Sequence, residues 1–175
     1  GTCSTCPPGT APSENGLTCE ACPQGKFSDR PGSSSCSFCP AGTFDSRIGP
    51  SAYCTRCPAG KFGENPGQIS QSSCTDCGAG RYRAEPGAGL RSDCLTCTPG
   101  TYNPSPGATS CSACGRGTYS FEMASVCTDC APGKASGTYT NNAASVVCAA
   151  CPGGKSGNAD LQRCDLCPSG KYSNP

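Results

Sequence analysis

The chain has 175 residues with a formal net charge of +1, and 20 of these residues are cysteine. Leucine, isoleucine, valine and phenylalanine together number only 15, too few for an ordinary hydrophobic core. The near-zero charge argues against binding to nucleic acid or an anionic membrane surface, and no apolar stretch is long enough to cross a bilayer. Cysteine at this density is typical of a disulfide scaffold, so we expect an extracellular protein, either secreted or at the cell surface.

All 20 cysteines fall into ten C-x-x-C pairs, whose first members lie 16 to 21 residues apart. These pairs divide the chain into ten consecutive repeats, numbered 1 to 10 below. The repeats span residues 3–18, 19–35, 36–53, 54–73, 74–93, 94–110, 111–126, 127–147, 148–163 and 164–175, the last being incomplete. Because the final pair opens a loop that no cysteine closes, we expect the segment to be a fragment of a longer array.

A glycine is the third residue after the second cysteine of every pair. A glycine at a fixed offset indicates a backbone position that needs a positive φ or a close approach of another chain segment. The sequence therefore predicts a structural turn at Gly9, Gly25, Gly42, Gly60, Gly80, Gly100, Gly117, Gly133, Gly154 and Gly170.

An aromatic residue follows the glycine by two positions in seven repeats, namely Phe27, Phe44, Phe62, Tyr82, Tyr102, Tyr119 and Tyr172. We expect these side chains to pack locally against disulfides. Four repeats then contain Pro-Gly, at 31–32, 66–67, 86–87 and 106–107, which predicts a type II turn. Each repeat is therefore predicted to form a short, irregular β-hairpin, in which an extended piece such as residues 26–28 lies between two turns. Almost no helix is expected.

The pattern C-x-x-C-P-x-G-[KT]-[FY]-S is intact at residues 19–28 and 164–173. It resembles the ephrin-receptor-like cysteine-rich repeat and is similar to the small modules of tumour-necrosis-factor receptors. The resemblance extends over the whole chain, although the proline is replaced by Gly78, Thr98, Gly115 or Ala131 in four repeats. Long arrays of such repeats occur in large surface and filament proteins of algae and protists, such as flagellar hairs, so the resemblance implies a structural role.

Paired C-x-x-C motifs also fit four-cysteine zinc sites. However, the chain has no histidine, and proline after the second cysteine in six pairs removes a backbone N–H that could bond to a metal thiolate. We therefore favour disulfides over structural zinc and expect no cofactor. A thioredoxin-like redox pair would need a helix N-terminus, which the pattern does not predict.

Two pairing schemes fit the repeat. One joins whole pairs, such as Cys3 to Cys19, into two-repeat blocks. The other joins the second cysteine of each pair to the first of the next. Two-repeat blocks should give spacings between cysteine pairs that alternate in length along the chain, and the observed spacings do not alternate, so we favour this second scheme. Its bridges are Cys6–Cys19, Cys22–Cys36, Cys39–Cys54, Cys57–Cys74, Cys77–Cys94, Cys97–Cys111, Cys114–Cys127, Cys130–Cys148 and Cys151–Cys164, with Cys3 and Cys167 pairing outside the fragment.

A chain of similar loops that contact their neighbours predicts an elongated rod. The uniform repetition and neutral charge favour a structural stalk or filament segment, whose partners are the neighbouring repeats and further copies of the chain. The alternative is a receptor or adhesion ectodomain that binds a protein along the rod. For that alternative, Arg81, Tyr82 and Arg83 form the one candidate anchor cluster.

The chain contains no histidine, and it has neither a nucleophile motif nor a phosphate-binding motif, so we do not expect an enzyme. N-glycans are not expected, because the only N-x-[ST] sequence has proline in its middle position. The hydroxyl runs are explained first by the polarity of exposed loops, and the alternative is that they carry O-linked glycans, with candidates at Ser33, Ser34, Ser35, Ser72 and Ser73.

Overall fold

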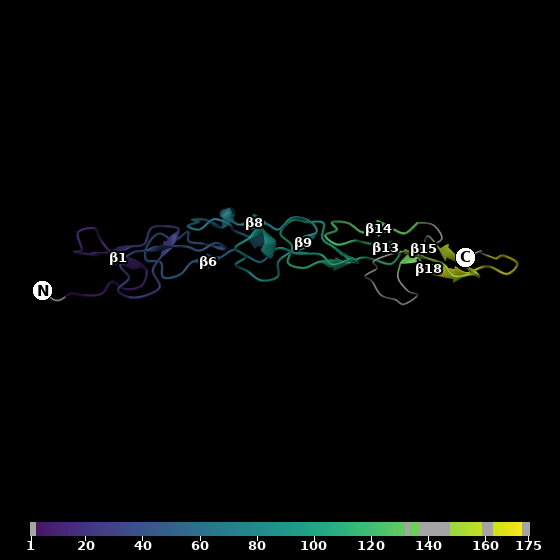
Figure 1. The fold of residues 1–175 in the computed structure, drawn as a ribbon, viewed down its shortest axis with the longest axis horizontal. Coiled ribbons are helices and arrows are strands. Elements are labelled where there is room, and N and C mark those ends of the chain that lie inside the picture. Colours follow the sequence, from purple (N-terminus) through teal and green to yellow (C-terminus); the bar gives the residue numbers. More distant parts are fainter. Residues whose placement is uncertain (1–2, 132–133, 137–147, 159–162, 173–175) are drawn as a thin grey trace. The chain divides into compact units, whose positions relative to one another are not determined.

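The computed structural model describes residues 3–131, 134–136, 148–158 and 163–172. The chain divides into two compact lobes. The first lobe contains Gly1–Cys77 and Arg83–Cys94, and the second contains Gly78–Tyr82 and Leu95–Pro175. Within each lobe the chain forms the same element again and again, a short two-stranded antiparallel hairpin (Figure 1).

In the first lobe, each hairpin pairs the strand after a turn glycine with the strand between the cysteines of the next pair. The aromatic residue thus lies opposite the residue that follows a cysteine, as Phe27 does with Ser37. The pairs are β1 (Thr10–Pro12) with β2 (Cys19–Ala21), β3 (Lys26–Phe27) with β4 (Ser37–Phe38), β5 (Thr43–Phe44) with β6 (Thr55–Arg56), and β7 (Lys61–Phe62) with β8 (Thr75–Asp76).

The second lobe repeats this arrangement, with Tyr82 opposite Leu95. Figure 1 shows β13 and β14 side by side, as their pairing requires. The pairs are β9 (Arg81–Tyr82) with β10 (Leu95–Thr96), β11 (Thr101–Tyr102) with β12 (Ser112–Ala113), β13 (Thr118–Tyr119) with β14 (Thr128–Asp129), β15 (Lys134–Ser136) with β16 (Cys148–Ala150), and β17 (Lys155–Asn158) with β18 (Arg163–Leu166).

Most strands are only two residues long because the next residue along the chain bonds elsewhere. Ser28, which follows β3, donates its N–H to the carbonyl of Ser51 and accepts at its own carbonyl from the N–H of Gly9. Its backbone groups are therefore satisfied by other repeats and cannot extend the hairpin ladder.

The second turn follows the sequence chemistry in the four repeats that contain Pro-Gly. Gly32, Gly67, Gly87 and Gly107 have φ between 72 and 90°, the positive value that the third residue of a type II turn requires. In the described residues the only helical elements are two single 3-10 turns, Gln71–Ser73 and Arg91–Asp93, in the long return segments of repeats 4 and 5. The prediction of a disulfide-rich repeat array of short hairpins with almost no helix is confirmed.

The buried apolar residues are mainly cysteines. Ten of the fourteen in the described parts are cysteine, and the others are Ala11, Phe44, Phe62 and Ala88. Phe44 packs with Cys57 and Cys74. Sulfur thus occupies the place that aliphatic side chains fill in an ordinary domain, and each small core lies beside a bridge rather than at a common centre.

Candidate functional site

The junction between successive repeats is the feature that recurs along the chain. Nine disulfides hold it, and each joins the second cysteine of one pair to the first cysteine of the next, with Cα atoms 5.6 to 5.7 Å apart. The bridges are Cys6–Cys19, Cys22–Cys36, Cys39–Cys54, Cys57–Cys74, Cys77–Cys94, Cys97–Cys111, Cys114–Cys127, Cys130–Cys148 and Cys151–Cys164.

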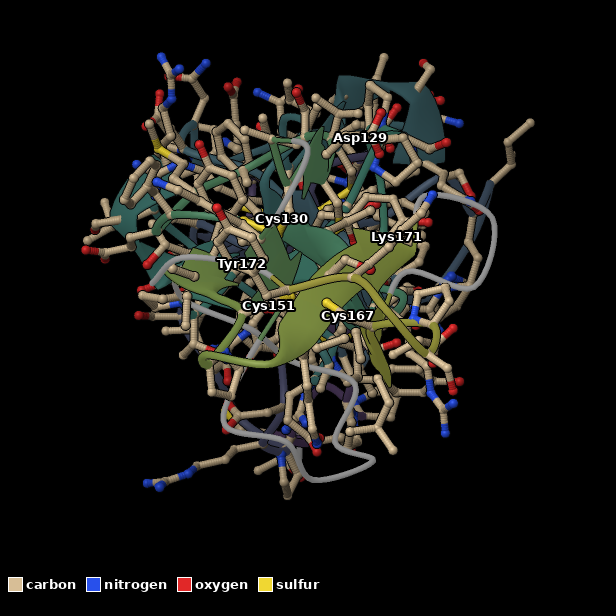
Figure 2. The ribbon with its side chains drawn as sticks, turned by 90° about the vertical axis from the view of Figure 1, so that its right-hand side faces the viewer. Asp129, Cys130, Cys151, Cys167, Lys171 and Tyr172 are labelled. Carbon is tan, nitrogen blue, oxygen red and sulfur yellow. A yellow bond between two sulfur atoms is a disulfide. The ribbon has the colours of Figure 1, made fainter. Side chains whose placement is uncertain are left out.

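Cys3 and Cys167 are outside these bridges. Cys3 is exposed and Cys167 is partly exposed. Figure 2 shows Cys167 together with Lys171 and Tyr172, the two exposed residues that follow its turn. The Tyr172 side chain is 84% exposed, so it packs far less than the aromatics of the earlier repeats.

The turn glycines form the backbone side of the junction. Nine of them have φ between 73 and 85°, and the tenth, Gly133, lies outside the described residues. The glycine carbonyl accepts from the N–H of the second cysteine in the next pair, as Gly25 does from Cys39 at 2.9 Å. In repeats 1 to 6 the glycine N–H donates to a carbonyl of the following repeat, as Gly25 does to Asp45 at 3.1 Å. The peptide groups on both sides of the turn are therefore bonded to the next repeat.

A further contact reaches the repeat after next. The N–H of Ser51 in repeat 3 lies 3.3 Å from the carbonyl of Gly9 in repeat 1. A Cβ on Gly9 would lie 2.6 Å from the same Ser51 nitrogen, and a Cβ on Gly42 would meet the carbonyl of Ala88 in repeat 5 at 2.9 Å. Glycine is thus required here for two reasons, the positive φ and the close backbone approach.

The junction also contains a polar position that the sequence patterns above did not predict, the sixth residue after the second cysteine. This residue is buried as Ser28, Asp45, Asn103 and Ser120. The Asn103 amide donates to the Arg81 carbonyl at 2.7 Å, and the Ser120 hydroxyl donates to the Thr101 carbonyl at 2.9 Å. The signal that could have found this position is the recurrence of small polar residues at a fixed offset from the cysteine.

In repeat 3 this position carries a buried charge. Asp45 is fully buried, and its Oδ1 accepts from Arg47 Nε at 2.6 Å. Arg47 also donates to the Ser51 hydroxyl at 2.8 Å and to the Tyr53 carbonyl, and its guanidinium lies 4.2 Å from the centre of the Tyr53 ring. Ile48-Gly49 replaces Pro-Gly in this repeat, so these side-chain contacts hold the second turn.

The pKa of Asp45 lies below its ordinary value. Burial raises this pKa, but hydrogen bonds from Ser51 and Arg47 and the Arg47 charge lower it by more. Asp45 is therefore ionised at neutral pH. Its Oδ2 is buried without a hydrogen-bond partner among the described residues.

The segment Arg81–Arg83 does not form one cluster of free anchors. Arg81 and Tyr82 lie in β9, where Arg81 is opposite Thr96. The guanidinium of Arg83 bonds to the carbonyls of Glu85 and Asp93, at 3.1 and 3.4 Å, within its own loop. Arg83 therefore supports the return segment of repeat 5.

In the parts of the chain that the structure describes, no group of three or more His, Cys, Asp or Glu side chains is placed to hold a metal ion. The same parts contain no helix of the length and hydropathy that a membrane span needs.

Comparison with known proteins identifies the repeat. A family model described as tyrosine-protein kinase ephrin type A/B receptor-like matches residues 9–52 and 49–94. No curated protein matches the chain. The two matches overlap and together cover repeats that carry the cysteine pairs, turn glycines and aromatics described above. Residues 9–94 therefore belong to the ephrin-receptor-like family of cysteine-rich repeats, a non-catalytic and extracellular type of module.

Proposed function

We propose that this chain is a structural segment of an extracellular protein, in which the repeats act as a stiff spacer in a stalk or filament. The observation that supports the proposal is the recurrence of one junction. Each of repeats 1 to 6 offers a bridge, a glycine N–H and a glycine carbonyl to the next repeat, and Gly9 with Ser28, Gly60 with Arg83 and Gly100 with Ser120 make the same bond at 2.7 to 3.0 Å.

A junction that joins each repeat to the next and touches the repeat after next resists bending. Such an array needs no large apolar core, because disulfides and backbone hydrogen bonds between repeats stabilise it instead. The proposed object is an elongated rod in which further copies of the repeat, or of the chain, continue the array.

Small-angle X-ray scattering on the oxidised chain tests this proposal. The matched variant lacks residues 54–73, so that Cys74 takes the place of Cys54 as the partner of Cys39. We expect a rod whose maximum dimension falls by about a tenth in the variant. A radius of gyration of about 16 Å, the value for a compact globule of this length, would reject the rod.

A receptor or adhesion ectodomain is the second candidate, because the matched family is named after a receptor. The two candidate functions predict different effects when one repeat is exchanged for another. A spacer tolerates exchange of any one repeat for another of equal length, whereas a receptor loses its partner when one particular repeat is exchanged.

We also propose O-linked glycans on the exposed hydroxyl runs. Ser34 and Ser35 are exposed, while the Ser33 hydroxyl donates to the Arg30 carbonyl at 2.8 Å. In the second run the Ser72 hydroxyl lies 2.9 Å from that of Ser70, and Ser73 is partly exposed. Intact mass of the native chain before and after removal of O-glycans tests this, and a mass equal to that of the bare polypeptide would exclude it.

A further inference from the structure

The aromatic residues that follow the turn glycines differ in how well they are covered. Phe44 and Phe62 are only 6 and 8% exposed. Phe44 packs on Cys57 and Cys74, the bridge of the next repeat, and Phe62 packs in the same way on Cys77 and Cys94. Each of these rings is therefore sealed against a disulfide.

The seal comes from the residue after the Pro-Gly turn of the next repeat. Gln68 forms an isolated β-bridge with Phe44, and Ala88 forms one with Phe62. Both covering residues lie in repeats whose cysteines are 17 residues apart and whose return segment contains a 3-10 turn. The longer return lets the chain fold back over the ring.

The ring of Tyr82 has no such cover. The next repeat is closed by Cys97–Cys111, with a separation of 14 residues, and its return segment forms no 3-10 turn. Ala108, which corresponds to Ala88, is partly exposed instead of 1% exposed. The result is an open hollow of about 270 Å³ lined by Tyr82, Thr98, Thr101, Ser110 and Cys111.

The lining of this hollow combines an apolar surface with hydroxyl groups. Tyr82 and Cys111 are its less polar residues, and no charged side chain is among the lining residues. Hydroxyl groups can donate and accept. The Thr101 hydroxyl donates to the Thr98 carbonyl at 2.7 Å and lies 3.5 Å from the Thr98 hydroxyl, and since a hydroxyl oxygen has two lone pairs, it can accept one further hydrogen bond. Thr98 and Ser110 are exposed.

We propose that this hollow binds one ring of a neutral saccharide. A sugar ring has an apolar C–H face that fits against an aromatic ring and hydroxyls that exchange hydrogen bonds with Thr and Ser. A charged ligand would lose its hydration without finding an opposite charge. The volume lies below the range of drug-sized sites, so a single ring fits and a larger ligand would extend into solvent. The inference rests on the Tyr82 hollow and is independent of the proposed structural role.

The saccharide can come from a separate polysaccharide or from a glycan attached to this chain, and the test separates these sources. The full chain is produced in an oxidising compartment without glycosylation and titrated with cellobiose, maltose and methyl galactoside, with NMR detection of the sugar C–H protons and the tyrosine ring protons. We expect at least one of these sugars to bind with saturation of its C–H protons from the Tyr82 ring.

Tyr82→Ala is expected to weaken that binding about tenfold, the factor that corresponds to loss of one aromatic contact. Tyr82→Phe keeps the ring and restores binding to within about threefold. Tyr119→Ala is the matched control, because Tyr119 is also partly exposed but does not line the hollow, and it should leave binding unchanged. Equal disulfide content in all three variants shows that a loss is not due to misfolding.

In native material, a neutral sugar attached at Thr98 or Ser110 with proton contacts to Tyr82 would support the proposal and identify the attached source. The proposal is overturned if the unglycosylated chain binds none of the three sugars and the native chain carries none at these positions. Loss of binding in Tyr119→Ala, or preference for a sulfated or uronic sugar over the neutral ones, also overturns it.

Discussion

A single hydrogen in place of a side chain decides how closely the repeats can approach. Gly9 has a φ of +84° and faces the backbone of Ser51 two repeats away, whereas Gly16 has a φ of +69° and faces open space. The two glycines therefore separate the cost of the backbone conformation from the cost of the contact. A non-glycine residue in this region costs about 1 to 2 kcal/mol through conformation alone.

We expect Gly16→Ala to lower the free energy of unfolding by about 1 kcal/mol, and Gly9→Ala to lower it by more, because its Cβ would lie 2.6 Å from a backbone nitrogen. Denaturant midpoints of the two variants with all disulfides intact measure the difference. Equal losses would show that the contact between repeats 1 and 3 carries no energy.

The buried Asp45 couples the second turn of repeat 3 to pH. A carboxyl group whose pKa is lower in the folded chain than in the unfolded chain stabilises the fold above its unfolded pKa, and this stabilisation is lost as the pH falls through the folded pKa. The pKa of Asp45 is lowered in the fold, so the loss begins near pH 4 and grows below it.

Asp45→Asn is expected to lower the free energy of unfolding by about 1 to 3 kcal/mol at neutral pH, because Arg47 loses its carboxylate partner. The difference from the native chain should shrink as the pH falls below about 4. Thermal melts at several pH values measure this. Asp29→Asn serves as the control, because the Asp29 carboxylate is 64% exposed and its ion pair with Arg30 Nε is long, at 3.9 Å. A pH-independent difference for Asp45→Asn would contradict the assignment.

At the scale of the element, a hairpin with strands of two residues cannot be stable alone. Each one has a disulfide at one end, and in repeats 3 and 4 an aromatic ring, Phe44 or Phe62, also packs against the next bridge. Phe62, in β7, is only 8% exposed, whereas Phe38, in β4 of another hairpin, is 62% exposed. The energy of the element is therefore concentrated in the residue that faces the bridge.

Phe62→Ala is expected to lower the free energy of unfolding by about 3 kcal/mol, because it removes the ring from the cluster with Cys77, Ala88 and Cys94. Phe38→Ala compares the same change at an exposed site, where Lys26 Nζ lies 4.5 Å from the ring centre, and should cost about 0.5 to 1 kcal/mol. Hydrogen exchange of the amide groups in β7 and β8 reports the local effect. Similar losses in both variants would rule out the packed ring as the source of stability.

At the scale of the whole molecule, the bridges divide stability into local contributions. The loop closed by Cys57 and Cys74 spans 17 residues, and its closure is worth about 3 kcal/mol in the chain-entropy model. In a repeat array the loss of one bridge should affect the adjoining repeats and leave distant ones folded.

The double substitution Cys57→Ser with Cys74→Ser tests this. We expect faster amide exchange in repeats 3 to 5, and no change at the N–H of Cys114, which bonds to the Gly100 carbonyl at 2.9 Å. Removal of Cys114 and Cys127 together is the matched experiment, and it should spare the N–H of Cys39. Loss of protection along the whole chain in either variant would mean that the array unfolds as one unit.

The spacing of cysteine and glycine along the chain was enough to predict the repeat, the hairpin class and the near-absence of helix, because these features depend on local turn chemistry. The contacts between repeats could be seen only in the folded chain. Burial of Asp45 and Asn103, the contact of Gly9 with Ser51 and the open ring of Tyr82 all depend on which segments of other repeats come to lie against them. Those contacts follow from the length of each return segment and from its folding in three dimensions, so no residue within one repeat specifies them.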